Sequence, residues 1–249
     1  MQLKTLTASN IPALLQFINK KMIRLLIWVC NVIIDLNIAG KLVIVVGAGT
    51  EGTRKVKALL GQGCKIIVVS NRLNKFLLDL AKDGKLSIVK TTLKDGGVLD
   101  KFEKPFLVLA CTNDRELNRK MVRKAKELGS FAYAADDPAA SDFIHPAVIN
   151  IGDTVFVTIS TKGQSPAMAR TLRIKAERVL KRLITKEDVD FVKLAGFARN
   201  AAMSSLKDST SRKKYLYAVI KDSKIKNLIK SKKFEDAKSA AMEILEAWA

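Results

Sequence analysis

A glycine-rich stretch has the spacing of a phosphate-binding turn: Gly47-Ala48-Gly49-Thr50-Glu51-Gly52. Gly47 permits a tight turn, Gly49 lets a pyrophosphate approach the backbone, and Gly52 lets a following helix pack closely on a sheet. A helix that starts here also offers free backbone N–H groups and the positive end of its dipole to phosphates. The spacing therefore predicts dinucleotide binding, with an ordinary glycine-rich turn as the alternative.

Two adjacent carboxylates are a second candidate for chemistry: Asp136-Asp137-Pro138, followed nearby by the only histidine, His145. Acidic residues before a proline are typical of a plain turn. They also come directly after an apolar stretch that we predict to be a strand, and catalytic groups of nucleotide-binding sheets lie at strand ends of this kind. The residue types alone leave both interpretations open, and His145 is more typical of a packed side chain than of a ligand.

The composition limits the kinds of site that the chain can hold. Its 249 residues, 48% of them hydrophobic, suit one large or two small globular domains. The three cysteines, Cys30, Cys64 and Cys111, form no C-x-x-C pair, which argues against a disulfide scaffold or a zinc site. A single histidine also argues against a histidine-based metal cluster. We therefore expect no metal site, and a reducing, cytoplasmic location.

The chain is strongly basic, with 44 Lys and Arg against 24 Asp and Glu and a formal net charge of +20. This balance suits a nucleic acid, a polyanionic small molecule, or only a solvated lysine-rich surface. Aromatic residues make up 6% of the chain, and the most basic stretch, Lys207–Lys233, has no base-stacking pattern. We therefore expect no nucleic-acid partner, while charge alone does not choose between the other two.

The residues around these motifs alternate between strand and helix patterns, which is typical of an α/β, Rossmann-like fold with a doubly wound parallel sheet. In such a sheet the nucleotide lies across the carboxyl ends of the strands, where the strand order reverses. The predicted strands are Lys41–Val46, Lys65–Ser70, Leu86–Lys90, Phe106–Cys111 and Ser130–Ala135. The predicted helical segments are Thr53–Gln62, Leu73–Asp83, Gly97–Phe102 and Arg115–Leu128.

The second predicted strand ends in Ser70-Asn71-Arg72, without the carboxylate that usually binds the adenosine ribose of NAD. Asn71 can still hydrogen-bond a ribose. Arg72 suits the 2′-phosphate of NADP, or is simply a solvated loop charge. The motif alone therefore leaves NAD and NADP open.

The second half of the chain changes to one strand followed by helices. Thr154–Thr161 alternates apolar and polar residues as a strand does. Ser165 and Pro166 suit the cap and first position of a basic helix over Ala167–Leu183. The remainder, from Thr185 to Trp248, has a helical pattern. We expect this part to form a small all-helical domain.

The segment before the glycine turn is partly apolar. Leu25–Ile34 holds about ten apolar residues, whereas a bilayer span needs roughly 20. No small-residue cleavage site follows it, so we expect neither a membrane partner nor a signal peptide. We predict a helix over Ile11–Ile18 and a buried strand, Val29–Leu36, at the edge of the sheet. Met22 is an alternative start of the natural chain.

Three blocks of residues, in order, resemble the precorrin-2 dehydrogenase family, which includes the amino-terminal part of siroheme synthases and bifunctional dehydrogenase/ferrochelatases. The first block is the glycine turn with Arg54-Lys55. The second joins Cys111-Thr112-Asn113-Asp114, Leu117-Asn118, Asp136-Asp137-Pro138 and Phe143-Ile144-His145-Pro146. The third is Ser160-Thr161-Lys162-Gly163-Gln164-Ser165-Pro166 with Ala169-Arg170 and Leu172-Arg173. The resemblance covers the chain from about Val32 onward.

The resemblance implies a reaction. Members oxidise precorrin-2, a tetrapyrrole with eight carboxylates, to sirohydrochlorin and pass hydride to NAD⁺. Some also insert Fe²⁺ in siroheme biosynthesis, so the resemblance leaves ferrochelatase activity open. Asp136 aligns with the family's essential aspartate, for which general-base catalysis is the plausible chemistry. A substrate with many carboxylates would also match the surplus of positive charge.

The resemblance also implies binding residues. Cofactor contacts are implied at Gly47, Gly49, Thr50, Glu51, Gly52, Asn71, Arg72 and Thr112. Substrate contacts are implied at Ser160, Thr161, Ser165, Arg170 and Arg173, because hydroxyl and guanidinium groups suit carboxylates. Family members are homodimers. We therefore expect an extension at residues 1–28, an NAD-binding domain at 29–146, a dimerisation and substrate segment at 147–180, and a helical domain at 181–249.

One departure and one alternative accompany the resemblance. Tyr133-Ala134-Ala135 stands where the family usually has Asn-Val-Val, so a substrate role for that asparagine has no counterpart in this chain. The alternative is a non-enzymatic nucleotide sensor, with a Rossmann domain and a basic helical effector. It accounts for the glycine turn and the basic helices but leaves Asp136-Asp137-Pro138 as coincidence.

Overall fold

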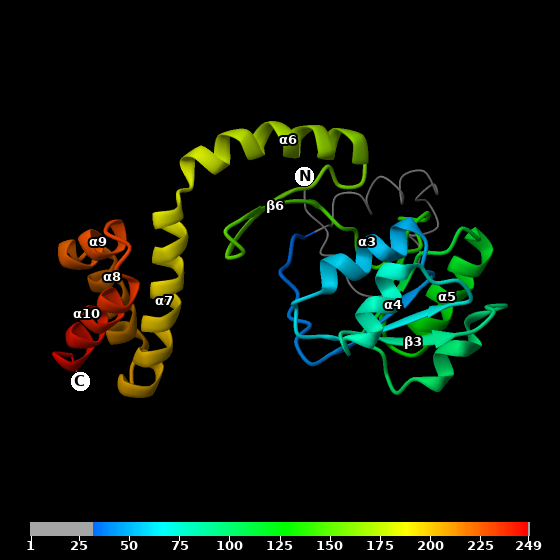
Figure 1. Ribbon diagram of the computed structural model, residues 1–249, viewed down its shortest axis with the longest axis horizontal. Helices are drawn as coiled ribbons and strands as arrows, with labels where there is room; N and C mark the ends of the chain where they lie inside the picture. The colour runs from blue at the N-terminus through cyan, green and yellow to red at the C-terminus, as the bar shows by residue number, and fades with distance from the viewer. Residues whose placement is uncertain (1–31, 249) are drawn as a thin grey trace, which may run out of the picture. The chain divides into compact units, whose positions relative to one another are not determined.

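The computed structural model describes residues 32–248, and the chain divides into two compact units, 1–145 and 146–249 (Figure 1). The extension at residues 1–28, the helix predicted over Ile11–Ile18 and the alternative start at Met22 lie outside the described residues. The division of the second unit at residue 180 stays a prediction.

The first unit holds a five-stranded parallel sheet in the order β3-β2-β1-β4-β5. The order reverses between β1 and β4, so the switch point lies at the carboxyl ends of these two strands. The predicted Rossmann-like sheet is confirmed. Its strands are β1 (Leu42–Val46), β2 (Lys65–Ser70), β3 (Ser87–Lys90), β4 (Leu107–Ala110) and β5 (Phe131–Ala134).

Helices cover both faces of this sheet, because alternate strand residues point to opposite sides. One apolar cluster joins strand residues such as Val43 and Val45 to α3 (Thr50–Leu59) and α4 (Lys75–Lys82). The other joins Ile44 and Val46 to the 3₁₀ segment η2 (Gly96–Lys101) and to α5 (Arg115–Glu127). The β1 residues from Val43 to Val46 are fully buried, as expected for a central parallel strand.

The predicted strand Val29–Leu36 is wrong over its described part. Residues 32–36 are irregular, and Val32 is 80% exposed. At the β5 edge of the sheet, Asp142 occupies hydrogen-bonding groups that another strand would use. Asp142 N–H donates to the Ala132 carbonyl oxygen at 2.9 Å, and Ala132 N–H donates to Asp142 Oδ2 at 2.9 Å. An apolar, β-branched run has strand propensity, but propensity does not provide a pairing partner.

The second unit begins with an antiparallel hairpin, β6 (Ala147–Ile151) and β7 (Val155–Ile159). The sequence pattern predicted β7 but not β6, although the two strands have equal length. The hairpin packs on α6 (Pro166–Leu183) through a small cluster around Ile149. Ser165 caps α6 and Pro166 occupies its first turn, as predicted.

Four helices complete the second unit: α7 (Lys186–Ser205), α8 (Ser209–Lys221), α9 (Ser223–Lys230) and α10 (Phe234–Glu246). Thr185 and Asp188 form a capping box at the start of α7, which satisfies N–H groups that a helix terminus leaves free. The fully buried Tyr215 donates its hydroxyl hydrogen bond to the Ala241 carbonyl oxygen at 2.9 Å, which ties α8 to α10. No helix within residues 32–248 has the length and apolarity needed to cross a membrane.

Candidate functional site

The glycine turn lies at the switch point and is held by both neighbouring strands. Gly47 has φ +99°, and its N–H donates to the Val69 carbonyl oxygen at the end of β2 at 2.9 Å. A Cβ at Gly47 would lie 2.7 Å from the Cys111 carbonyl oxygen, beyond the end of β4. Backbone conformation and space therefore both require glycine at this position.

The other two glycines leave the start of α3 open to a ligand. A Cβ at Gly52 would collide with the Gly47 carbonyl oxygen, so Gly52 allows the helix to lie against the turn. A Cβ at Gly49 would meet nothing within 4 Å. Gly49 also provides no side-chain cap for α3. The backbone N–H groups of the first helical turn, including that of Thr50, are thus suited to phosphate oxygens.

A side chain that the sequence analysis overlooked, Asn74, connects the glycine turn to the loop after β2. Its Nδ2 donates to Thr53 Oγ1 at 2.8 Å, and its Oδ1 caps α4 by accepting from Leu77 N–H at 3.0 Å. Asn71 and Arg72 in the same loop are exposed. An asparagine directly before a helical run is a cap signal that could have identified Asn74.

Glu51, a predicted cofactor contact, is engaged in ion pairs within α3. Its two carboxylate oxygens accept hydrogen bonds from Arg54 at 2.9 and 2.6 Å, and Lys55 Nζ lies 3.5 Å from Oε1. The hydrogen bond from Arg54 and the nearby positive charges lower the pKa of Glu51 despite its partial burial. Glu51 therefore anchors the first turns of α3, and its contact with the cofactor stays a prediction.

Lys55 is a buried charge beneath the glycine turn. Its side chain is 4% exposed, and burial lowers its pKa to about 8.

The rings of Phe143 and His145 pack against Tyr133, with centroids 5.6 and 4.9 Å from its own. Desolvation, together with the charges of Lys55 and Arg54, lowers the pKa of His145, although its ring keeps contact with solvent. His145 is thus an exposed residue whose ring makes edge contacts with Tyr133 and Phe143.

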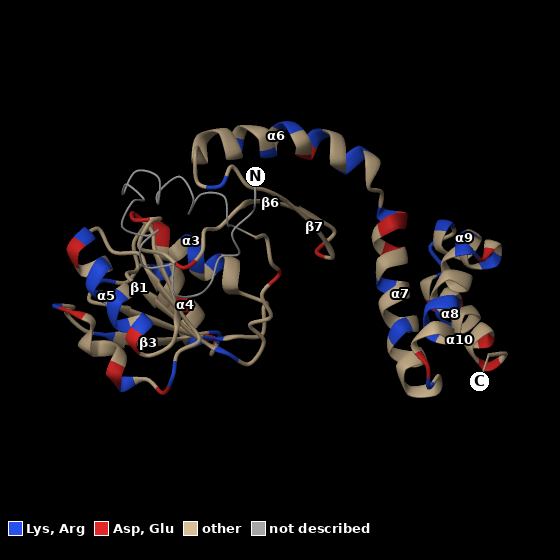
Figure 2. Ribbon diagram, turned by 180° about the vertical axis from the view of Figure 1, so that it is seen from behind, with Lys and Arg blue, Asp and Glu red and all other residues tan. Residues whose placement is uncertain are grey.

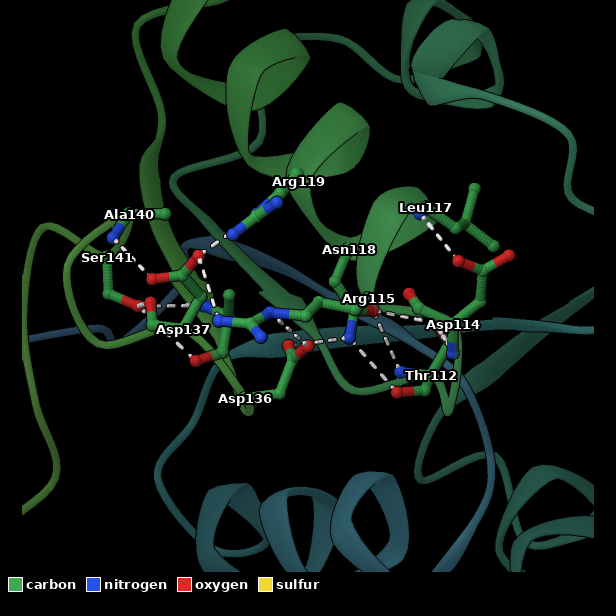
Figure 3. Close-up of polar contacts among 11 residues, drawn as sticks. Thr112, Asp114, Arg115, Leu117, Asn118, Arg119, Asp136, Asp137, Ala140 and Ser141 are labelled. Atoms are coloured by element: carbon green, nitrogen blue, oxygen red, sulfur yellow. Dashed lines mark hydrogen bonds and ion pairs between the residues drawn. The ribbon is translucent and has the colours of Figure 1, made fainter.

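Asn118, in the first turn of α5, is fully buried and links the ends of β4 and β5 (Figure 3). Its Oδ1 accepts hydrogen bonds from the N–H and the hydroxyl of Thr112, at 3.1 and 2.7 Å. Its Nδ2 donates to the Thr112 carbonyl oxygen at 3.0 Å and to Asp136 Oδ1 at 2.8 Å. Thr112 and Asp136, for which the sequence predicts cofactor binding and catalysis, are thereby brought together at one edge of the sheet.

The two adjacent carboxylates differ in their surroundings. Asp137 is 13% exposed and accepts hydrogen bonds from Arg119 Nε at 3.1 Å and from Ala140 N–H at 3.3 Å. Burial opposes its ionisation, but these bonds and the charges of Arg119 and Arg115 lower the pKa of Asp137. Asp136 is 34% exposed, and its Oδ2 lies 3.9 Å from Arg115 Nε. Asp137 therefore clamps the loop to α5, whereas the second oxygen of Asp136 has only this long contact with the exposed Arg115.

The predicted substrate hydroxyls surround the loop before α6, in the second unit. Ser160 is exposed. Thr161 Oγ1 accepts from Ser165 N–H at 3.3 Å and donates to the Ser165 carbonyl oxygen at 3.2 Å. Ser165 Oγ accepts from Met168 N–H at 3.2 Å as the helix cap. Thr161 and Ser165 therefore already shape the loop, and their contact with substrate stays a prediction.

The two predicted substrate arginines lie on α6 and differ in availability. Arg170 is exposed, whereas Arg173 pairs with Glu177 one turn later. A ligand carboxylate would meet Arg170 directly and would have to compete with Glu177 for Arg173.

The most basic stretch, Lys207–Lys233, forms α8 and α9 (Figure 2), and its lysines are exposed. Within residues 32–248 no group of three or more His, Cys, Asp or Glu is placed to hold a metal ion.

Comparison with known proteins agrees with this geometry. Residues 34–147 match a family model described as "Putative NAD(P)-binding". Over 179 residues the chain is 31% identical to siroheme synthase of Neisseria meningitidis serogroup C (strain 053442). Over 140 residues it is 36% identical to siroheme synthase 1 of Aeromonas salmonicida (strain A449). The chain is thus similar to siroheme synthases over its nucleotide-binding domain, and the cofactor of that domain is NAD(P).

The matched part is only a portion of these relatives. The first alignment covers 72% of this chain and 35% of the Neisseria protein, and the second covers 56% and 29%. The chain thus spans about a third of the length of the curated relatives that it matches. A solved structure, SirC, precorrin-2 dehydrogenase, superposes with a TM-score of 0.62 at 21% identity and covers 84% of this chain and 100% of that one. This similarity shows a shared fold.

Proposed function

We propose that this protein oxidises precorrin-2 to sirohydrochlorin with NAD⁺ as the hydride acceptor. The observation that carries the proposal is the pair at the end of β5. Asp137 is hydrogen-bonded to Arg119. Asp136 is held at one oxygen by a buried amide, and its other oxygen has only a 3.9 Å contact with Arg115. The names of the relatives, siroheme synthases, and of the structural neighbour, a precorrin-2 dehydrogenase, support the choice of substrate.

The residues of the glycine turn fit the cofactor. The open space at Gly49 and the uncapped start of α3 suit its pyrophosphate, and Thr112 suits its nicotinamide end. When bound, NAD⁺ accepts a hydride from the substrate. Asp136 takes the proton that the macrocycle loses in the same oxidation, so two electrons and two hydrogens leave the substrate in all. The chain's own part is to hold substrate and base in register.

The wider assignments belong to the same proposal. Ser160, Thr161, Ser165, Arg170 and Arg173 bind carboxylates of the substrate, and the +20 charge attracts that polyanion. The segment 147–180 forms the interface of a homodimer. The protein acts in the cytoplasm. Asp136 could also remove pyrrole protons before Fe²⁺ insertion, and this extension is tested with the main assay.

The test is an anaerobic assay in which purified protein receives precorrin-2 with NAD⁺, with NADP⁺ or without nucleotide. The expected result is nucleotide-dependent appearance of sirohydrochlorin absorbance, together with an equal amount of reduced nicotinamide. A rate equal to that of the no-enzyme control would overturn the proposal. NAD⁺ binding without turnover would favour the nucleotide-sensing alternative. Added Fe²⁺ or Co²⁺ then tests whether sirohydrochlorin absorbance is replaced by that of a metallated product.

A further inference from the structure

The environment of Asn118 is unusual for a helical residue. Asparagine is a poor helix former, and a buried amide is costly unless its donors and acceptors are all used. Asn118 has no exposed surface, and its Oδ1 and both Nδ2 hydrogens have partners on Thr112 and Asp136. All hydrogen-bonding positions of the amide are thus occupied by groups at the two strand ends that border the site.

The partners fix the orientation of the amide. The backbone N–H of Thr112 can only donate, so the atom facing it must be Oδ1. The Thr112 carbonyl oxygen can only accept, so the atom facing it must be Nδ2. The second hydrogen of Nδ2 then points at Asp136 Oδ1, at 2.8 Å. A donor in this place fixes the orientation of the Asp136 carboxyl group.

The helix does not need Asn118 for its own stability. Asp114 already caps α5 by accepting from Leu117 N–H at 3.0 Å. Apolar side chains bury the helix against the sheet, namely Leu117, Met121, Val122 and Ala125. An apolar residue at position 118 would continue this packing without burying a polar group. What such a residue would remove is the hold on Thr112 and on Asp136.

We propose that Asn118 is a positioning residue, which fixes the Asp136 carboxylate through Oδ1 and thereby directs Oδ2 toward the reacting proton. This inference rests on the proposed function, because Asp136 is the base of that reaction. It assigns Asn118 no contact with substrate or cofactor. Its effect on the rate passes through the hydrogen bond to Asp136, beside the hold that the same amide has on Thr112.

The test is Asn118→Leu, which replaces the amide by an apolar side chain of similar size. We expect kcat to fall about tenfold to a hundredfold, the range for loss of a hydrogen bond to a charged group. The KM for precorrin-2 should change less than threefold. The control is Asn227→Leu, which makes the same change at an exposed position on α9 and should match wild type.

A double-mutant cycle separates positioning from a merely structural role. In an Asp136→Ala background, Asn118→Leu should lower the residual rate clearly less than it lowers the wild-type rate. An equal loss in both backgrounds would overturn the inference.

A readout without turnover keeps the inference separate from the proposed function. In crystal structures of wild type and of Asn118→Leu, the Asp136 carboxylate should hold one orientation in wild type and leave it in the variant. If wild type is inactive but this change occurs, the proposed function fails and the hold on Asp136 stands. If wild type is active and the carboxylate keeps its orientation in the variant, Asn118 does not position Asp136. Asn118→Ala serves this comparison if Asn118→Leu does not fold.

Discussion

Lys55 Nζ lies 4.0 Å from the centroid of the Tyr133 ring, so an ammonium on α3 rests on an aromatic face of β5. The ring's negative face attracts the cation, and the attraction is stronger where water is excluded. This cation–π pair joins the helix that follows the glycine turn to the strand that precedes Asp136.

The burial of Lys55 predicts a pH-dependent stability. The pKa of Lys55 is about 8 in the folded protein, whereas the ordinary pKa of lysine is 10.5, so the unfolded chain binds the proton more tightly. Stability from this group is therefore present above about pH 10.5 and lost as the pH falls through about 8. Wild type gains this stability as the pH rises, and Lys55→Met does not. The free energy of unfolding of Lys55→Met minus that of wild type should therefore fall by on the order of 2–3 kcal/mol between pH 8 and pH 10.5.

Urea denaturation at several pH values, followed by circular dichroism, measures this difference. Lys57→Met is the matched control, because Lys57 lies on the same helix, is exposed, and also contacts a ring, that of Phe76. For the control, the difference in free energy of unfolding from wild type should not change with pH. If the difference for Lys55→Met does not change with pH either, burial does not lower the pKa of Lys55.

The glycine turn predicts opposite outcomes for two alanine substitutions. Gly47→Ala should destabilise the fold by about 2 kcal/mol or more, because φ is +99° and the new Cβ would lie 2.7 Å from the Cys111 carbonyl oxygen. Gly49→Ala has free space, so stability should change by less than about 1 kcal/mol. Its methyl group would instead project toward the phosphates, and NAD(P) affinity should fall about tenfold or more. Calorimetric titration with NAD⁺ and NADP⁺, beside thermal melts, distinguishes the two effects.

The sequence predicted the sheet well because its signals are local. The apolar runs, the glycines and the Ser165–Pro166 cap each act within a few residues. The contacts that define the site are not local: Asn118 meets Asp136 across 18 positions, and Asn74 meets Thr53 across 21. No periodicity encodes such pairs.

The sequence also could not separate the two adjacent carboxylates, because their difference lies in tertiary contacts. Arg119, on the second turn of α5, selects Asp137, and Asn118 selects Asp136. The failed prediction at Val29–Leu36 has a related cause. An apolar run specifies a tendency to pair, whereas the free edge it needs is a property of the whole sheet.

The contrast between the two carboxylates predicts distinct losses of activity. Asp136→Ala should lower turnover by at least about a hundredfold, as expected for removing a general base, with an unchanged Kd for NAD⁺. Asp137→Asn should keep most of the turnover, because Asp137 has no free oxygen to offer. Anaerobic rates and NAD⁺ titration of both variants measure this. Equal losses in the two variants would mean that the loop, and not the base, is what Asp136→Ala removes.

The ionic clamp at Asp137 predicts a loss of stability that depends on pH. The pKa of Asp137 in the folded protein lies below the ordinary value of 3.8 for aspartate. The stabilisation from this group is therefore present above about pH 4 and is lost as the pH falls through the pKa of the folded protein. Asp137→Asn should therefore lower the free energy of unfolding by about 1 kcal/mol at pH 7. The difference should shrink toward zero below pH 4. A difference that stays constant with pH would assign the loss to packing of the loop.

The surface of α6 predicts how the proposed homodimer forms. Four of its exposed apolar residues fall within about 60° of one another around the helix at 100° per residue, namely Met168, Leu172, Val179 and Leu183. Leu172 and Ile174 are 39% and 38% exposed, but Ile174 lies off this stripe. Leu172→Glu should therefore yield a monomer, because it buries a charge in the interface, while Ile174→Glu should remain dimeric. Light scattering after gel filtration at micromolar concentration measures both. A monomeric wild type, or equal behaviour of the two variants, would exclude this stripe as the interface.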